Sequence, residues 1–274
     1  GTDPVKVTDM LKIKSPSGLS LSKDGSSALF TLTAIEPDGN SRLEYKYTTQ
    51  VWMVATDGHT APRPLTTREN ASQAAFSPDG KQIVFVRTVD GRPQLFLLTL
   101  TGGEAVQLTT FKYGAVSPQW SPDGRHLLFA AGIPLRDMLS DSLLNPDREL
   151  PAWPFEKPGM DNALALKIYT AKPDPDGSLE EIRVYLDNDV TDKKAKVVTK
   201  LNFQDEMEVN ADMSFTQFFI MEAVPNAKPK AITSGFYRYN SAGFTPDGRQ
   251  VIISGNRDSL QHPDRSLEGE IFIA

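Results

Sequence analysis

The chain has 274 residues, which is enough for one large all-β domain or two ordinary ones, and it carries a formal charge of −6. This acidic balance, without any basic run that carries interleaved aromatic residues, argues against a nucleic-acid or membrane-surface partner. The chain has no cysteine, which excludes disulfides, thiolate catalysis and cysteine-based zinc sites and fits the cytoplasm or a bacterial periplasm.

One short phrase is repeated along the chain. It reads LSKDGSSALFT at Leu21–Thr31, FSPDGKQIVFV at Phe76–Val86, WSPDGRHLLFA at Trp120–Ala130 and FTPDGRQVIIS at Phe244–Ser254. Proline presets φ for a tight turn, aspartate bonds back to the backbone, and glycine takes the left-handed conformation. The β-branched and aromatic run that follows is typical of a buried strand, so each copy predicts a strand, a turn and a second strand.

A second phrase follows the first. It occurs at Gln50–Thr66, Gln94–Thr109 and Gln217–Thr233, with a truncated copy at Glu270–Ala274. Each full copy predicts a third strand, a turn and a short fourth strand that ends in Leu-Thr or Ile-Thr. The distance from this glutamine to the next turn glycine is 30, 30 and 31 positions, whereas the distance from a turn glycine to the next such glutamine is 25, 14 and 93. All the length variation therefore falls between the second and third strands.

A four-stranded unit repeated about every 40 to 45 residues indicates a β-propeller blade. We therefore predict an all-β fold, a partial β-propeller of about four four-stranded blades over residues 1–274. The variable connections should all leave one face, where binding loops commonly lie. A β-sandwich is the alternative, but it gives no reason for the constant register.

The long connection predicts an insertion in the third blade, from about Ile133 to Ser214. Its first part is rich in proline and aromatic residues, so we expect an ordered loop with Trp153 and Phe155 as anchors. A short strand and a turn at 167–177 should precede one helix, for which Ser178–Glu181 provides an S-x-x-E capping box. A strand over 195–203 should then lead back to the blade.

The sequence contains no recognisable reaction centre. No G-x-S-x-G nucleophile elbow is present, and His59, His126 and His262 lack metal-ligand spacing, so we predict no catalytic residue, metal or cofactor. Glu180 and Glu181 remain as candidates, because adjacent carboxylates can bind a substrate ammonium group. The simpler interpretation is that both glutamates cap the helix and interact with its dipole.

These phrases together resemble a known family. The segment Val7–Thr33 looks like the opening of the propeller domain in the prolyl oligopeptidase family of serine peptidases, in particular the bacterial acylaminoacyl-peptidase and dipeptidyl-peptidase-like group. The segment from Pro62 to Thr110 is similar to the blades of that group, and 195–203 resembles the segment that re-enters the blade after its long insertion. The S-P-D-G repeat alone is less specific, because TolB-type propellers share it.

The resemblance implies a seven- or eight-bladed propeller that precedes an α/β-hydrolase domain and restricts entry to short peptides. This chain would be the non-catalytic part that gates and selects a peptide substrate, in a periplasmic or secreted protein, with the C-terminal α/β-hydrolase domain absent from it. The resemblance also implies that Glu180 and Glu181, on the inserted helix, bind the substrate N-terminus. The alternative is a TolB-like, non-enzymatic propeller that binds a protein or peptide.

An open arc of blades leaves sheet faces uncovered. We therefore expect self-association into a homo-oligomer, or partial disorder near Gly255–Ala274.

Overall fold

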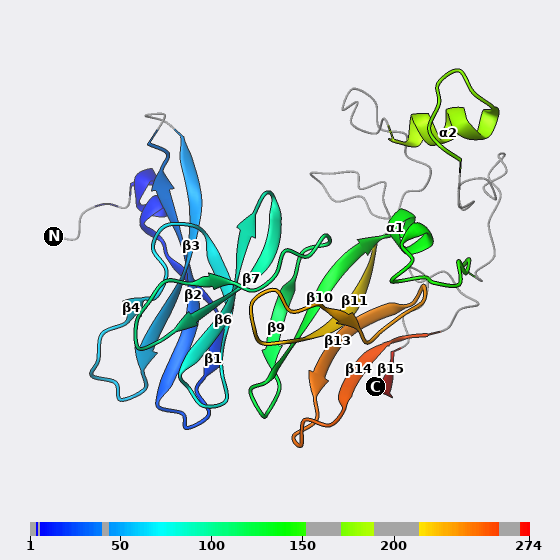
Figure 1. Cartoon of the computed structure of the whole chain (residues 1–274). Helices are drawn as coiled ribbons and strands as arrows, with labels where there is room; N and C mark the ends of the chain where they lie inside the picture. Colours follow the sequence, from blue (N-terminus) through cyan, green and yellow to red (C-terminus); the bar gives the residue numbers. More distant parts are fainter. Residues whose placement is uncertain (1–3, 5, 40–43, 152–170, 189–213, 258–268) are drawn as a thin grey trace.

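The computed structural model describes residues 4, 6–39, 44–151, 171–188, 214–257 and 269–274. Within these ranges the strands form four antiparallel sheets, three of four strands and one of three. Strands follow one another in sequence order across every sheet, as in the blades of a propeller. The predicted all-β partial propeller of about four blades is confirmed, with sheets that lie side by side in an open arc (Figure 1).

The four blades are consecutive in the chain. Blade 1 consists of β1 (Ser15–Leu21), β2 (Ser27–Pro37), β3 (Tyr45–Ala55) and β4 (Arg63–Pro64), and blade 2 of β5 (Ala71–Phe76), β6 (Gln82–Val89), β7 (Arg92–Thr99) and β8 (Val106–Gln107). Blade 3 consists of β9 (Val116–Trp120), β10 (His126–Pro134), β11 (Ser214–Glu222) and β12 (Lys230–Ala231), and blade 4 of β13 (Arg238–Phe244), β14 (Val251–Asn256) and β15 (Glu270–Ile273). A 3₁₀ helix, η1 (Val7–Lys12), precedes β1, and two α-helices, α1 (Leu135–Ser140) and α2 (Leu179–Asn188), lie between β10 and β11.

The repeated turn has the same geometry in all four blades. In blade 2, Ser77 Oγ donates to Asp79 Oδ1 at 2.6 Å and accepts the Gln82 N–H at 3.0 Å, while Gly80 adopts φ of +70°. The hydroxyl before the aspartate therefore closes the turn that the Pro-Asp-Gly sequence begins. In blade 1 the hydrogen bonds from Ser22 and Ser26 lower the pKa of Asp24 to about 2.

The second phrase also corresponds to a fixed set of hydrogen bonds. Thr109 Oγ1 donates to Gln94 Oε1 at 2.6 Å and accepts the Leu95 N–H at 2.9 Å, while Gln94 Nε2 donates to the carbonyl oxygen of Phe111 at 3.0 Å. We call this arrangement the Gln–Thr clasp. Blade 1 has the corresponding Gln50–Thr66 bond, and blade 3 has the Gln217–Thr233 bond, both at 2.6 Å. The clasp ties the third strand of a blade to a threonine two residues beyond the end of its fourth strand.

Each blade packs against its neighbours through two faces. The leading face meets the preceding blade, and in blades 2 and 3 it carries a cross-strand aromatic pair on the second and third strands. The pairs are Phe85 with Phe96 and Phe129 with Phe219, stacked at centroid distances of 5.8 and 5.5 Å. Stacked pairs of this kind add to the stability that apolar burial provides.

The trailing face of each blade meets the blade that follows. Leu29 and Val51 of blade 1 belong to the same buried cluster as the Phe85–Phe96 pair of blade 2. Val84 and Leu95 of blade 2 pack in the same way with the Phe129–Phe219 pair of blade 3, and Leu128 and Phe218 of blade 3 pack with Val251 and Ile253 of blade 4. The core is therefore a series of interfaces between blades, because every sheet has two apolar faces to bury.

Part of the predicted insertion lies outside the described residues. This applies to the anchors Trp153 and Phe155, to the predicted strand at 167–170 and to the predicted strand over 195–203. The predicted helix is present as α2, whereas the sequence analysis did not predict the short helix α1. Of the segment near Gly255–Ala274, residues 258–268 are not described, and β15 pairs with β14 over its whole length.

Candidate functional site

The connections between second and third strands leave the same end of the blades. The opposite end carries the repeated turns, which are stacked so that Pro78 lies beside Gly124 and Pro122 beside Gly248. Figure 1 shows these turns along the lower edge of the arc, with α1 and α2 at the other end. We call the end that carries α1 the loop face. Neighbouring strands of a blade run antiparallel, so the turn between the first and second strands and the connection between the second and third strands lie at opposite ends of the blade. The second-to-third connection of every blade therefore falls on the loop face.

Helix α1 is anchored to the connection between blades 2 and 3. Its residues Met138 and Leu139 are buried. Tyr113 Oη donates to Asp141 Oδ2 at 2.6 Å, and Lys112 Nζ lies 3.7 Å from the same oxygen. Burial raises the pKa of Tyr113, and its bond to Asp141 raises it further.

Electrostatics keep Asp141 ionised beside that tyrosine. Burial acts to raise the pKa of Asp141, but the hydrogen bonds from Tyr113 and from the Leu143 N–H outweigh it and the pKa is lowered. Lys112 Nζ also lies 3.6 Å from Asp137 Oδ2, so one ammonium faces two carboxylates. The sequence alone does not indicate this cluster, because Tyr113 and Asp141 are 28 positions apart and belong to no motif.

The segment after α1 is held by local hydrogen bonds. Asn145 is buried, and its side chain donates to the carbonyl oxygen of Glu149 and accepts the Glu149 N–H, both at 2.8 Å. Arg148 Nη1 donates to the carbonyl oxygen of Ser140 at 2.5 Å. Residues 135–149 therefore form an elaboration of the loop face that is held together by its own hydrogen bonds.

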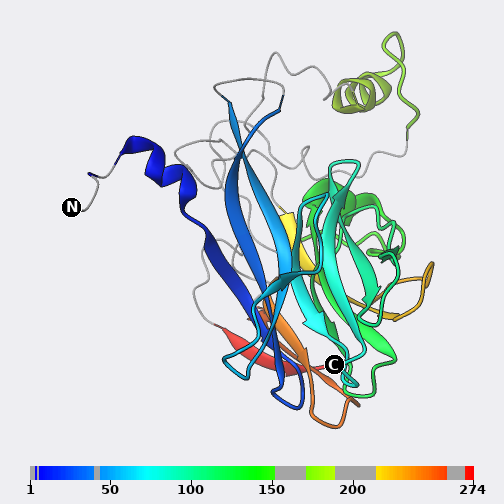
Figure 2. The ribbon, with the colours of Figure 1, turned by 90° about the vertical axis from the view of Figure 1, so that its left-hand side faces the viewer.

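The two candidate glutamates lie on the first turn of α2. Glu181 Oε2 accepts the Ser178 N–H at 2.7 Å, and the Glu181 N–H donates to Ser178 Oγ at 3.4 Å, which together are the predicted capping box. The Ser178 hydroxyl also donates to Glu181 Oε2 at 2.8 Å. These bonds, the backbone bond first, lower the pKa of Glu181. Glu180 is exposed and no hydrogen bond is described for its carboxylate, so the two glutamates have different surroundings. Helix α2 lies at the same end of the molecule as α1 (Figures 1 and 2).

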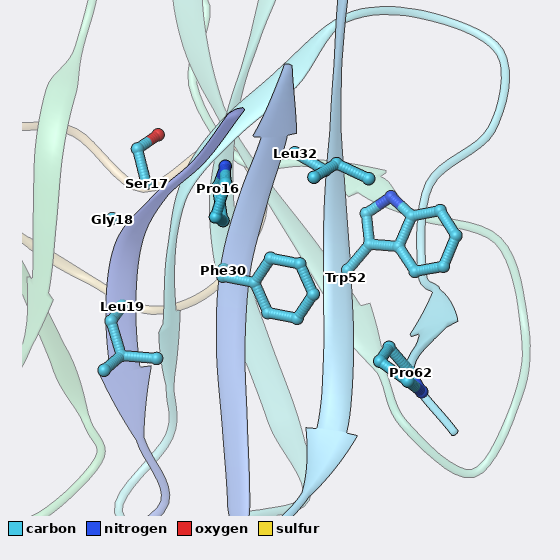
Figure 3. A pocket seen from close by; sticks show the side chains of 8 residues that line it. All are labelled: Pro16, Ser17, Gly18, Leu19, Phe30, Leu32, Trp52 and Pro62. Atoms are coloured by element: carbon cyan, nitrogen blue, oxygen red, sulfur yellow. The ribbon is translucent and has the colours of Figure 1, made fainter. Parts of the chain in front are cut away.

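An apolar groove opens on the leading face of blade 1, away from the loop face. Its volume is about 650 Å³, and it is lined by Pro16, Ser17, Gly18, Leu19, Phe30, Leu32, Trp52 and Pro62. Figure 3 shows Phe30 on β2 beside Trp52 on β3, and the two rings are stacked at 6.5 Å. None of these eight lining residues is charged, so the groove would bind a ligand or partner mainly through apolar contacts.

The described part of the chain shows neither a metal-binding cluster nor a membrane-spanning helix. Among those residues, no three His, Asp or Glu side chains gather where they could hold a metal ion. None of the described helices is long and apolar enough to cross a membrane.

Comparison with known proteins identifies relatives among peptidases and TolB. No protein-family model matches the chain. It is 25% identical over 138 residues to the uncharacterized peptidase YuxL of Bacillus subtilis, covering 50% of this chain and 20% of YuxL. It is 29% identical over 134 residues to dipeptidyl-peptidase 5 of Porphyromonas endodontalis, covering 47% of this chain and 18% of that protein. It is 34% identical over 79 residues to the Tol-Pal system protein TolB of Alcanivorax borkumensis, covering 28% of this chain and 18% of TolB.

Among solved structures, the acylaminoacyl peptidase of Pyrococcus horikoshii aligns with a TM-score of 0.52 and 16% identity, over 97% of this chain and 32% of the peptidase. The matched regions thus span about a fifth of the curated relatives and a third of the solved peptidase. At that identity the structural match supports the fold alone. Together the relatives confirm the predicted resemblance to peptidase propellers, of which this chain covers only a part.

Proposed function

We propose that this chain is the non-catalytic propeller portion of a serine peptidase that cleaves short peptides, of dipeptidyl or acylaminoacyl type. In this proposal the propeller gates entry and selects the substrate, and an α/β-hydrolase domain outside this chain supplies the catalytic residues. The observation that carries the proposal is the elaborated loop face of a propeller whose sequence relatives are peptidases. Anchored elaborations at one end of a blade array suit a selective entrance.

We further propose that Glu180 and Glu181 bind the substrate ammonium group. Glu180 is the better acceptor for a new hydrogen bond, because its carboxylate is exposed, whereas Glu181 already accepts two hydrogen bonds from Ser178. A carboxylate with remaining acceptor positions can still receive an ammonium N–H. Glu181 is ionised at neutral pH, as an ordinary glutamate is, and its lowered pKa keeps it ionised to more acidic pH, which favours a cationic partner.

Localisation belongs to the same proposal. We place the protein in the periplasm or outside the cell, where short peptides are available as substrates. The absence of cysteine is compatible with a bacterial periplasm, and the similarity to a Tol-Pal system protein supports the same assignment.

The test begins with the source gene. Its reading frame should continue beyond the codon for Ala274 into a G-x-S-x-G elbow, followed by an aspartate and a histidine. The whole product should then hydrolyse dipeptidyl or acylaminoacyl anilides and react with a fluorophosphonate, whereas residues 1–274 alone should do neither. A frame that ends without a hydrolase would refute the peptidase proposal.

The glutamates have a separate test in the whole protein. Glu180→Gln and Glu181→Gln should each raise KM for peptides with a free N-terminus, with kcat much less affected. Glutamine also suits the capping box, so Glu181→Gln should preserve α2. N-acylated peptides serve as the control, and an equal loss on both substrate types would contradict N-terminus recognition.

A second candidate function is a TolB-like propeller that binds a protein or peptide without catalysis. The 34% identity to TolB over 79 residues favours it, because that match is the highest in identity among the relatives described above. A reading frame that closes after further blades, with no hydrolase, would support this alternative.

A further inference from the structure

An arginine lies at the loop-face end of the interface between blades 1 and 2. Arg87 is on β6, two residues before that strand ends at Val89, and its side chain is 17% exposed. Its guanidinium carbon lies 5.3 Å from the ring centre of Phe85 and 5.1 Å from that of Phe96. Arginine stacks favourably on aromatic faces, so the two rings limit the directions in which the planar guanidinium can face.

The fold of a blade does not require a charge at this position. In blades 1, 3 and 4 the residues at the same distance from the turn glycine are uncharged; they are Leu32, Ala131 and Gly255. In blade 3 the ring of Phe111 contacts the aromatic pair instead. An apolar side chain can therefore cover such a pair, whereas burying most of a guanidinium costs free energy unless it is paired and hydrogen-bonded.

The hydrogen-bonding groups of Arg87 have no partner among the described residues. Its Nε is buried and makes no hydrogen bond. Glu69 Oε2 lies 3.3 Å from Nε in an ion pair that lacks the geometry of a hydrogen bond, and the Glu69 side chain is 68% exposed. The two Nη atoms also make no described hydrogen bond and, unlike Nε, are not buried. A guanidinium has five N–H groups, so this one can still donate to a ligand.

We propose that Arg87 binds a carboxylate of a peptide ligand, which takes the place that the Glu69 carboxylate holds in this structure. The fork of N–H groups on a guanidinium matches the two oxygens of a carboxylate. Glu69 is largely exposed and accepts no hydrogen bond from Arg87, so its displacement costs little. That the ligand carries a carboxylate follows from this geometry, and that it is a peptide rests on the proposed function.

The experiment measures peptide binding to the 274-residue chain by calorimetry at low ionic strength. The probes are N-acetyl-trialanine, which has a free terminal carboxylate, its C-terminal amide, and N-acetyl-Ala-Glu-Ala amide, whose carboxylate is in the side chain. Acetylation removes the ammonium group that Glu180 and Glu181 would bind. At least one carboxylate peptide should bind severalfold more tightly than trialanine amide, and the tighter of the two identifies which carboxylate Arg87 receives.

Two variants change the site in opposite directions. Arg87→Gln should abolish the preference for the carboxylate peptide. Glu69→Gln should raise the affinity for that peptide severalfold, because it removes the competing carboxylate and leaves Arg87 in place; a merely structural ion pair would give no such gain. Arg68→Gln is the matched control, since Arg68 is exposed and precedes Glu69 in the same connection. It removes the same charge as Arg87→Gln and should keep the parent's preference.

Two results would overturn the proposal. They are a parent chain that binds all three peptides equally, and a Glu69→Gln variant that binds the carboxylate peptide no better than the parent does. Glu69 is exposed, so the second result does not depend on whether Arg87→Gln folds. Both measurements read binding without a hydrolase domain. Their failure would therefore leave the peptidase proposal untouched, and a reading frame without a hydrolase would leave the binding result untouched.

Discussion

At the residue scale, the Gln–Thr clasp is the most constant polar feature of the blades. In blades 1, 2 and 3 the threonine hydroxyl donates to the side-chain oxygen Oε1 of the glutamine at 2.6 Å. The same hydroxyl accepts the backbone N–H of the residue that follows the glutamine on the third strand. Gln94, Thr109, Gln217 and Thr233 are all buried. A buried polar group is stable only when its hydrogen bonds are made, so the two side chains depend on one another.

Replacing Thr109 by valine should therefore destabilise the protein more than a surface substitution does. The change leaves the Leu95 N–H and the Gln94 side chain without this partner in a buried place, at a cost of about 1–3 kcal/mol in the free energy of unfolding. Urea unfolding followed by circular dichroism measures the loss. Thr110→Val is the matched control, because Thr110 is exposed and adjacent; equal losses for the two variants would contradict the clasp.

At the scale of single elements, α2 shows how a local motif determines a helix terminus. The helix begins at Leu179, directly after Ser178, whose hydroxyl and N–H bond to Glu181. Leu179 and Tyr185 are exposed, and among the residues that the structure describes α2 makes few contacts with the blades. A helix with little tertiary packing depends more on its cap than a buried helix does.

We predict that Ser178→Ala weakens α2 while the blades remain intact. Loss of a serine N-cap costs about 1 kcal/mol, which should raise amide hydrogen exchange across 179–188 severalfold. Exchange in β6, β7 and β10 should not change. Glu180→Gln tests the same helix without removing a cap contact, and faster exchange in that variant would show that the cap is not the cause.

At the scale of the whole molecule, stability resides in the interfaces between blades. Phe129 is fully buried against blade 2, whereas its counterpart Phe30 lies beside the open groove. The two residues have the same position in the repeat and the same chemistry. They differ only in whether another blade covers them.

Phe129→Ala should therefore cost about 3–5 kcal/mol, the usual loss for a buried phenylalanine. Phe30→Ala should cost clearly less, because Phe30 is only partly buried and lines the open groove. Thermal unfolding of both variants makes the comparison directly. Equal losses for the two variants would contradict this difference in burial.

Much of this fold could be predicted from local sequence. The Pro-Asp-Gly turns and the continuous apolar runs specify the strands, because each acts over a few neighbouring residues, and the constant spacing between phrases indicates their order and the four blades. The start of α2 is likewise determined by Ser178 and Glu181, which are three positions apart. Physical contacts within one turn or hairpin can be recognised from residue types and spacing alone.

Other features were decided only by the tertiary structure. The phrases at 50–66 and 94–109 begin and end with the clasp residues, yet their bond appears only when the third and fourth strands are laid side by side. The Tyr113–Asp141 contact likewise requires α1 to fold back on blade 2. The groove on blade 1 is the clearest case, since Phe30, Phe85 and Phe129 follow the same local pattern and differ in exposure. Local sequence makes both faces of a central strand apolar, but the burial of each face depends on whether another sheet lies against it.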